Sequence, residues 1–278
     1  MDTGIIEFLS YGFIQRALIA GSFIALICSL LGVVLVLRRL SLIGDGLSHV
    51  TFSGVALGLF LNVYPLYVSL PLVICSALGI LRLADKARMY GDAAIGIVSS
   101  VGIAAGVMLA SLGGGFNVDL FSYLFGNILS ISGYEVASSI GLSILVMAVI
   151  ALYFNEILSI TFDEEFARAS GINTGKINTI LVMLTGITVV LTMKVVGIML
   201  TSALLILPAS TAFQLARGFR NAMVISAVTS VTSVVAGIFI SFMMNLPTGA
   251  TVVLLNAGFF LAAFLYKQHG RNPSPPAQ

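Results

Sequence analysis

Long apolar segments constrain the fold of this chain more than any other feature. A helix needs about 20 apolar residues to cross the hydrocarbon core of a membrane, and nine segments approach or reach that length. Charged residues make up 9% of the chain, against roughly 25% in a soluble domain, so they are too few to cover a water-facing surface. We therefore expect an all-α fold, a polytopic transmembrane helical bundle of about eight or nine spans. The expected spans are residues 17–37, 43–62, 66–83, 93–111, 134–154, 177–193, 195–214, 221–244 and 250–266.

The span count depends on residues 177–214, where Lys194 alone separates two apolar runs. This region forms either two spans or one long helix followed by a broken one. A second irregular stretch, residues 119–132, is apolar but too short to cross a membrane. We expect it to form a half-helix or an interfacial segment on the outer side.

The lysines and arginines predict the orientation of the bundle, because they prefer cytoplasmic loops near the ends of spans. Placing their clusters inside puts the N-terminus outside and the C-terminus in the cytoplasm, and the nine spans then alternate. Arg16 and Lys194 are the exceptions. We expect a multi-pass protein of the cell (inner or cytoplasmic) membrane, surrounded by lipid. The clusters lie at residues 38–39, 82–88, 168–176, 217–220 and 267–271.

Three regions follow from this pattern. Residues 1–15 place apolar side chains beside Asp2 and Glu7, which is typical of a short amphipathic helix at a membrane interface. Residues 16–268 form the transmembrane domain. Residues 269–278 contain three prolines and no apolar run, and we expect a disordered tail.

Two pairs of glycines predict close packing between helices: Gly54 with Gly58, and Gly102 with Gly106. Small residues four positions apart lie on one helix face and let two backbones approach each other. Such pairs indicate a tight bundle and no particular function.

Asp45 and His49 stand in an otherwise apolar segment. A spacing of four residues places both side chains on one helix face, and ionisable groups inside a membrane are costly and usually functional. Carboxylate oxygen and neutral imidazole nitrogen together suit a divalent transition metal. The alternative is a structural hydrogen bond between the two, in a polar seam with Ser48 and Ser53.

Two ligands are too few for a closed tetrahedral metal site. A two-fold homodimer with this helix at its axis would supply two oxygens and two nitrogens. One chain's pair with water molecules would instead give an open, weaker site. Weak binding suits a transporter, since the ion must leave again.

Other motifs argue against an enzyme and against nucleotide binding by this chain. Gly175 and Lys176 resemble the end of a phosphate loop, but Ser170 stands where the loop needs glycine and Ile177 where it needs serine or threonine. The sequence contains no serine-hydrolase elbow and no HExxH zinc motif. If ATP drives this protein, a separate subunit must bind it. The net charge of +2 gives no reason to expect a nucleic-acid partner.

Four stretches carry a resemblance to a known family. They are residues 38–49 (RRLSLIGDGLSH), 119–126 (DLFSYLFG), 162–171 (FDEEFARASG), and 197–200 (GIML) with 207–209 (LPA). Through them the chain resembles, from about Ile14 to Tyr266, the permease subunits of bacterial ATP-binding-cassette importers for zinc and manganese. Gly46 departs from the pattern, since that position is often alanine in the family.

The resemblance implies a homodimeric pore of two permeases, two cytoplasmic ATPase subunits and an extracytoplasmic solute-binding protein. It also implies a fold similar to that of the vitamin B12 and iron–siderophore permeases. The family's metal-coordinating acid and histidine fall on Asp45 and His49. Its helix that couples to the ATPase falls on the stretch that contains Phe162, Asp163, Glu164, Glu165, Phe166, Arg168 and Gly171.

We therefore expect a permease for ATP-driven import of a divalent transition metal, zinc before manganese. The ion is cargo, no cofactor is expected to be bound permanently, and ATP hydrolysis is expected on the partner subunit. Two alternatives remain. An ion-coupled secondary transporter would use Asp45 and His49 as a proton relay, although other membrane-embedded charges are scarce and no inverted repeat is evident. A cassette-type permease for a metal chelate or vitamin would have a wider pore and no ligand pair.

Overall fold

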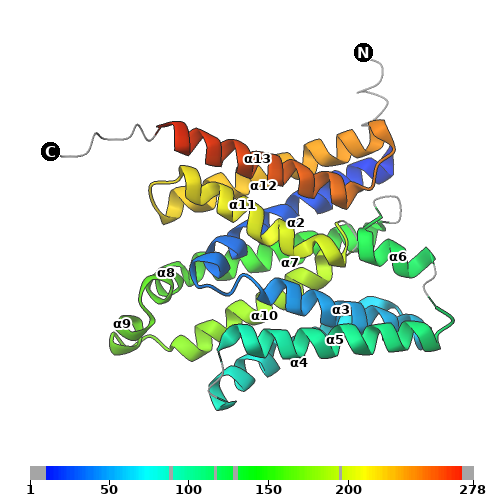
Figure 1. Cartoon of the computed structure of the whole chain (residues 1–278), viewed down its shortest axis with the longest axis horizontal. Coiled ribbons are helices and arrows are strands. Elements are labelled where there is room, and N and C mark those ends of the chain that lie inside the picture. Colours follow the sequence, from blue (N-terminus) through cyan, green and yellow to red (C-terminus); the bar gives the residue numbers. More distant parts are fainter. Residues whose placement is uncertain (1–10, 88–89, 116–117, 128–130, 194–195, 271–278) are drawn as a thin grey trace.

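The computed structural model describes residues 11–87, 90–115, 118–127, 131–193 and 196–270, and every regular element in these ranges is a helix (Figure 1). The elements are α2 (Gly12–Leu37), α3 (Ile43–Phe60), α4 (Pro65–Ala87), α5 (Gly91–Leu112), α6 (Val118–Phe125), α7 (Gly133–Leu152), α8 (Phe154–Phe162), α9 (Glu164–Ala169), α10 (Thr174–Thr192), the short 3-10 helix η2 (Ile198–Leu200), α11 (Thr201–Leu215), α12 (Phe219–Met244) and α13 (Thr248–Gly270).

Seven of these helices are long and apolar enough to cross a membrane: α2, α4, α5, α7, α10, α12 and α13. Together with α3 and α11 they match the nine predicted segments one for one, which confirms the all-α transmembrane bundle. α11 has 15 residues, or about 22 Å at 1.5 Å per residue. It is therefore shorter than the hydrocarbon core, which is roughly 30 Å thick.

α2 lies at the centre of the bundle and packs against α7, α11 and α12. α3 packs between α4 and α5, and α10 packs against α4, α3 and α2. The molecule thus has one group of helices around α2 and a second around α3 (Figure 1). α2 and α10 are the most buried of the seven spanning helices, as expected for helices that are apolar on every side.

The region 177–214 forms two separate helices, α10 and α11, of which α10 alone is long enough to span a membrane. α10 ends at Thr192, and the chain turns at Gly197 before η2 and α11 begin. Gly197 has φ of +94°, and a Cβ there would lie 2.4 Å from the carbonyl oxygen of Leu124 in α6. Only glycine satisfies both the backbone angle and the close contact. Lys194, which the sequence placed between the two segments, lies outside the described residues.

The short helices occupy opposite ends of the bundle. α6 lies at one end, within the stretch predicted to form a half-helix, and α8 and α9 lie at the other (Figure 1). α2 begins at Gly12 and α13 ends at Gly270, so residues 12–15 and 269–270 belong to spanning helices. The rest of the predicted N-terminal interfacial segment and of the C-terminal tail lies outside the described residues.

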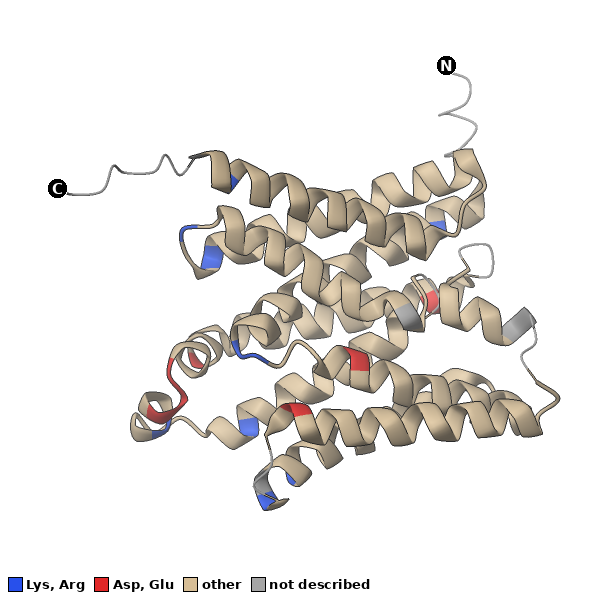
Figure 2. Ribbon diagram, viewed as in Figure 1, with Lys and Arg blue, Asp and Glu red and all other residues tan. Residues whose placement is uncertain are grey.

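Positive charge is distributed unevenly along the bundle. Most lysines and arginines gather at the end that carries α8 and α9, on the left in Figure 2, and few lie at the other end. The two ends therefore differ in the property that sets membrane orientation.

Candidate metal site

Asp45 and His49 lie in the first two turns of α3 and share one face of it. The Nε2 atom of His49 lies 3.6 Å from Oδ2 of Asp45, and the two side chains are 21% and 52% exposed. Within the part of the chain that the structure describes, no group of three or more His, Cys, Asp or Glu side chains could hold a metal ion. The described part of one chain thus presents two adjacent, accessible candidate ligands and no larger group.

The position of Asp45 follows from the way α2 ends. Arg39 adopts a left-handed backbone (φ +58°), and the amide of Leu40 donates to the carbonyl of Leu35 at 2.8 Å, a helix-ending pattern that usually employs glycine. The chain then runs back along the bundle before α3 begins at Ile43 (Figure 1). Asp45 stands in the first turn of α3, where the positive end of the helix dipole favours a carboxylate.

Ser202 is a further member of the site, which the sequence analysis missed. Its hydroxyl donates to Oδ1 of Asp45 at 3.4 Å from the first turn of α11. The two helices meet closely because residue 44 is glycine, and a Cβ there would lie 2.6 Å from Cδ1 of Leu205. Hydrogen bonds of this kind orient a ligand and tune its binding of metal. The sequence gives no signal for this contact, since 157 residues separate Ser202 from Asp45.

The polar seam considered as the structural alternative does not form around the pair. Ser48 donates to the carbonyl of Gly44 at 2.8 Å, and Ser53 donates to the carbonyl of Gly102 in α5, also at 2.8 Å. Both serines thus bond to backbone, whereas Asp45 lies beside His49 and accepts from Ser202.

Glycines fix α3 between its two neighbours. A Cβ on Gly54 would lie 2.6 Å from Cα of Ser69 in α4, and one on Gly106 would lie 2.4 Å from Cδ1 of Phe52 in α3. Backbones approach this closely only where a side chain is absent. The same crowding occurs at Gly46 (2.7 Å to Cγ2 of Ile95), Gly58 (2.8 Å to Cα of Pro65) and Gly102 (3.0 Å to the amide nitrogen of Val50).

The predicted coupling stretch forms the end of α8 and all of α9. Asp163 caps α9, since its Oδ1 accepts from the amide of Phe166 at 2.9 Å. Gly171 follows the helix with φ of +86°. The side chains of Phe162 and Phe166 are exposed, at 69% and 66%. The exposed side chains of Phe162, at the end of α8, and Phe166, on the capped helix α9, form a surface suited to a protein partner.

Glu164 is held by contacts within the molecule. Its Oε2 lies 2.8 Å from Nη2 of Arg38 at the end of α2, and its Oε1 accepts from Asn178 of α10 at 3.2 Å. Arg38 also donates to Asn178, and Arg168 lies 3.6 Å from Glu164. Burial lowers the pKa of Arg38, and the carboxylate of Glu164 opposes that shift. Glu165, by contrast, is exposed.

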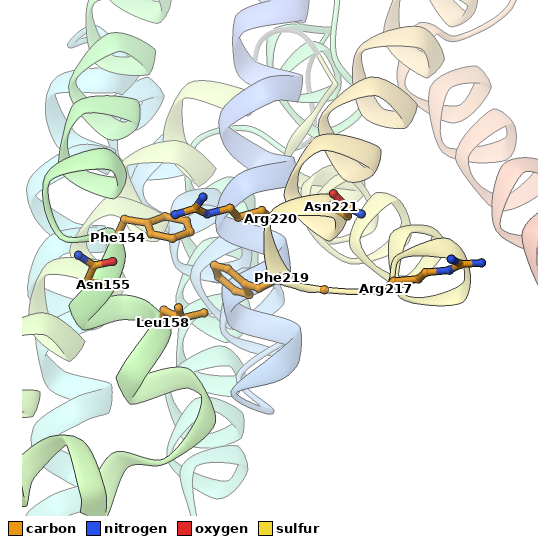
Figure 3. A pocket seen from close by; sticks show the side chains of 8 residues that line it. Phe154, Asn155, Leu158, Arg217, Phe219, Arg220 and Asn221 are labelled. Carbon is orange, nitrogen blue, oxygen red and sulfur yellow. The ribbon is translucent and has the colours of Figure 1, made fainter.

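A cavity of about 370 Å³ adjoins this end of the molecule, between α8 and the start of α12 (Figure 3). The guanidinium of Arg220 lies 5.4 Å from the centre of the Phe154 ring, within range of a cation–π contact. Phe219 packs against Phe154 and Phe162, with ring centres 5.7 and 6.3 Å apart. Arg217 points away from this cluster in Figure 3. The aromatic surface of the coupling stretch thus continues into a positively charged hollow.

Comparison with known proteins places this geometry in a family. The model of the ABC 3 transport family matches residues 10–267. The manganese transport system membrane protein MntC of Listeria innocua is 33% identical over 258 residues, which are 93% of this chain and 92% of that protein. The high-affinity zinc uptake system membrane protein ZnuB of Haemophilus influenzae is 33% identical over 253 residues, 91% of this chain and 97% of that protein.

A solved structure, PsaBC from Streptococcus pneumoniae in complex with Fab, superposes with a TM-score of 0.85 at 31% identity and covers 95% of both chains. The relatives are transport components and not enzymes. Because the family match spans nearly the whole chain, this protein belongs to the ABC 3 transport family, as the permease subunit of an ATP-binding-cassette importer of metal ions.

Proposed function

We propose that Asp45 and His49 from two symmetry-related copies of this chain bind the transported ion. The observation that carries the proposal is an exposed acid–imidazole pair in a chain with no larger ligand cluster among its described residues. A two-fold axis beside α3 would join two carboxylates and two imidazoles, which is a full tetrahedral set. The ion is then cargo and not a resident cofactor.

The ion in this proposal is zinc or manganese. Carboxylate oxygen and imidazole nitrogen accept both, and the relatives named for manganese and for zinc are equally similar, at 33% identity. The order of zinc before manganese therefore stays a prediction, and uptake measurements must rank the two.

The proposed orientation places α9 in the cytoplasm of a cell whose inner (cytoplasmic) membrane holds the bundle. The excess of lysine and arginine at that end supports this (Figure 2). α2 begins at the opposite end, and α13 ends at the same end of the bundle as α9 (Figure 1), so the N-terminus would be outside and the C-terminus inside.

The proposed partners follow from the two ends. A cytoplasmic ATPase would dock on Phe162, Phe166 and the adjoining cavity, and an extracytoplasmic solute-binding protein would deliver the ion at the α6 end. Support for the first comes from the exposure of both phenylalanines. Glu165 is exposed and suits a docking role, whereas Glu164 is engaged with Arg38.

The test is uptake by the permease reconstituted with its ATPase in liposomes that contain ATP. We expect ATP-dependent uptake of zinc, manganese or both, reduced at least about tenfold by Asp45→Asn and by His49→Ala because each removes a ligand. Asp92→Asn is the matched control, since Asp92 also stands in the first turn of a spanning helix, α5. Uptake driven by a pH gradient without ATP would favour the secondary transporter, and wild-type rates in both site variants would refute the metal role of the pair.

A further inference from the structure

Three side chains from three separate elements meet at the α9 end of the bundle. Glu164 of α9 accepts from Arg38 at 2.8 Å and from Asn178 at 3.2 Å, and Arg38 also donates to Asn178. We call this set the Arg38–Glu164–Asn178 triangle. Each member contacts the other two, so α9 cannot shift relative to α2 and α10 without breaking hydrogen bonds to the charged groups of Arg38 and Glu164.

Arg38 differs from the other cations at this end in being buried. Its side chain is 9% exposed, while its neighbour Arg39 is exposed and forms no ion pair among the described residues. The side chain of Glu164 is 37% exposed, so the pair is buried on the Arg38 side only. Removal of Glu164 would leave the buried guanidinium without a compensating charge. The structure therefore holds Arg38 firmly to Glu164.

A short hydrogen-bonded link joins Arg38 to the proposed metal site. Arg38 is the C-cap residue of α2 and follows Leu37 directly. The amide of Leu40 donates back to Leu35 at 2.8 Å, that of Ile43 donates to Leu40 at 3.1 Å, and that of Gly46 donates to Leu42 at 3.0 Å. Backbone hydrogen bonds thus recur along the turn between Arg38 and Asp45 and restrict its movement.

We propose that the Arg38–Glu164–Asn178 triangle transmits movement of α9 to the first turn of α3, so that Arg38 acts as a positioning residue for Asp45. The proposal rests on the proposed function, in which the ATPase moves α9 and Asp45 binds the ion. Glu164 receives the displacement from α9, Arg38 passes it to the end of α2, and the turn at residues 38–42 passes it to α3. Asn178 keeps the carboxylate and the guanidinium aligned from the side of α10.

The test uses the complete permease–ATPase complex in liposomes and measures metal ions imported per ATP hydrolysed. Glu164→Gln and Arg38→Gln should each lower this ratio about tenfold while ATP hydrolysis continues. The ATPase would still hydrolyse ATP, but the movement of α9 would no longer be transmitted to Asp45. The double variant should lose no more than either single variant, since the two residues act as one unit. Arg38→Lys keeps the charge without the guanidinium fork and should recover part of the ratio. If Arg38→Gln does not assemble, Arg38→Lys replaces it as the test variant.

Arg82→Gln is the matched control, since it removes an exposed positive charge from α4, outside the proposed path, and should leave the ratio unchanged. A merely structural role predicts less assembled complex with a normal ratio, which size-exclusion chromatography and the ratio together distinguish. If the wild-type complex imports metal with ATP but the single variants keep its ratio, or the double variant loses about a hundredfold, the inference is overturned and the proposed function stands. A wild-type complex that imports no metal would overturn both.

Discussion

At the scale of single residues, Asp45 is the side chain on which the proposed chemistry depends. It stands next to His49 on one helix and receives the hydroxyl of Ser202 from another. The pair could be predicted because both residues lie on one helix turn, where spacing alone fixes their proximity. Ser202 could not, because a lone serine 157 residues away leaves no periodic signal. The Arg38–Glu164 contact, across 126 residues, escaped prediction for the same reason.

Ser202→Ala should weaken binding of the ion without abolishing transport. Loss of the hydroxyl leaves the carboxylate of Asp45 less well oriented, and such losses cost about 10-fold in metal affinity at the lower end of their range. We expect the concentration for half-maximal uptake to rise by up to that factor while the maximal rate stays near wild type. Ser210→Ala, further along α11, is the control, and equal kinetics for both variants would remove Ser202 from the site.

At the scale of elements, α3 owes its place to glycine contacts with α4 and α5. The apolar segments predicted every spanning helix, because about 20 residues of hydrocarbon leave a strong compositional signal. The break at Gly197 did not follow from the sequence, since it depends on a contact with α6 that no local pattern encodes. The pairing of α3 with its two neighbours likewise depends on tertiary packing. The sequence predicted that the glycine pairs allow close packing, but not which helices they bring together.

Gly54→Ala should destabilise the permease by about 1–3 kcal/mol, the usual cost of forcing extra volume into a packed contact. The new methyl group would lie 2.6 Å from Cα of Ser69, which is backbone and cannot rotate away. Gly79→Ala in α4 is the control, because a Cβ there meets nothing within 4 Å, and alanine is the better helix former. Thermal unfolding of both variants in mild detergent measures the difference, and equal midpoints would contradict the packing role.

At the scale of the whole molecule, the proposed metal site would have half of its ligands on one exposed face of α3. Leu42, Asp45 and His49 recur at intervals of three and four residues, so they share that face. Leu42 is 49% exposed. In a two-fold dimer with this face at the axis, Leu42 of each copy would lie near its counterpart.

Leu42→Cys should therefore form disulfide-linked dimers in membranes under mild oxidation. The variant is made together with Cys75→Ser, since Cys75 is exposed, whereas Cys28 is buried and can stay. The wild-type chain, with Cys75 on α4 as its exposed thiol, is the control and should stay monomeric on a non-reducing gel. Absence of cross-linked dimer from an active, reconstituted Leu42→Cys complex would place the two-fold axis elsewhere.

The exposed side chains of Phe162 and Phe166 also affect how long a newly synthesised permease survives before assembly. Until a partner covers them, two phenylalanines at the end of the bundle remain open to the surrounding water, and open aromatic surface of this kind invites aggregation or capture by quality-control proteases. A permease without its ATPase would then be short-lived, and the slower-made subunit would set the number of finished transporters. The surface proposed to couple the permease to its ATPase would in this way also keep the amounts of the two subunits matched.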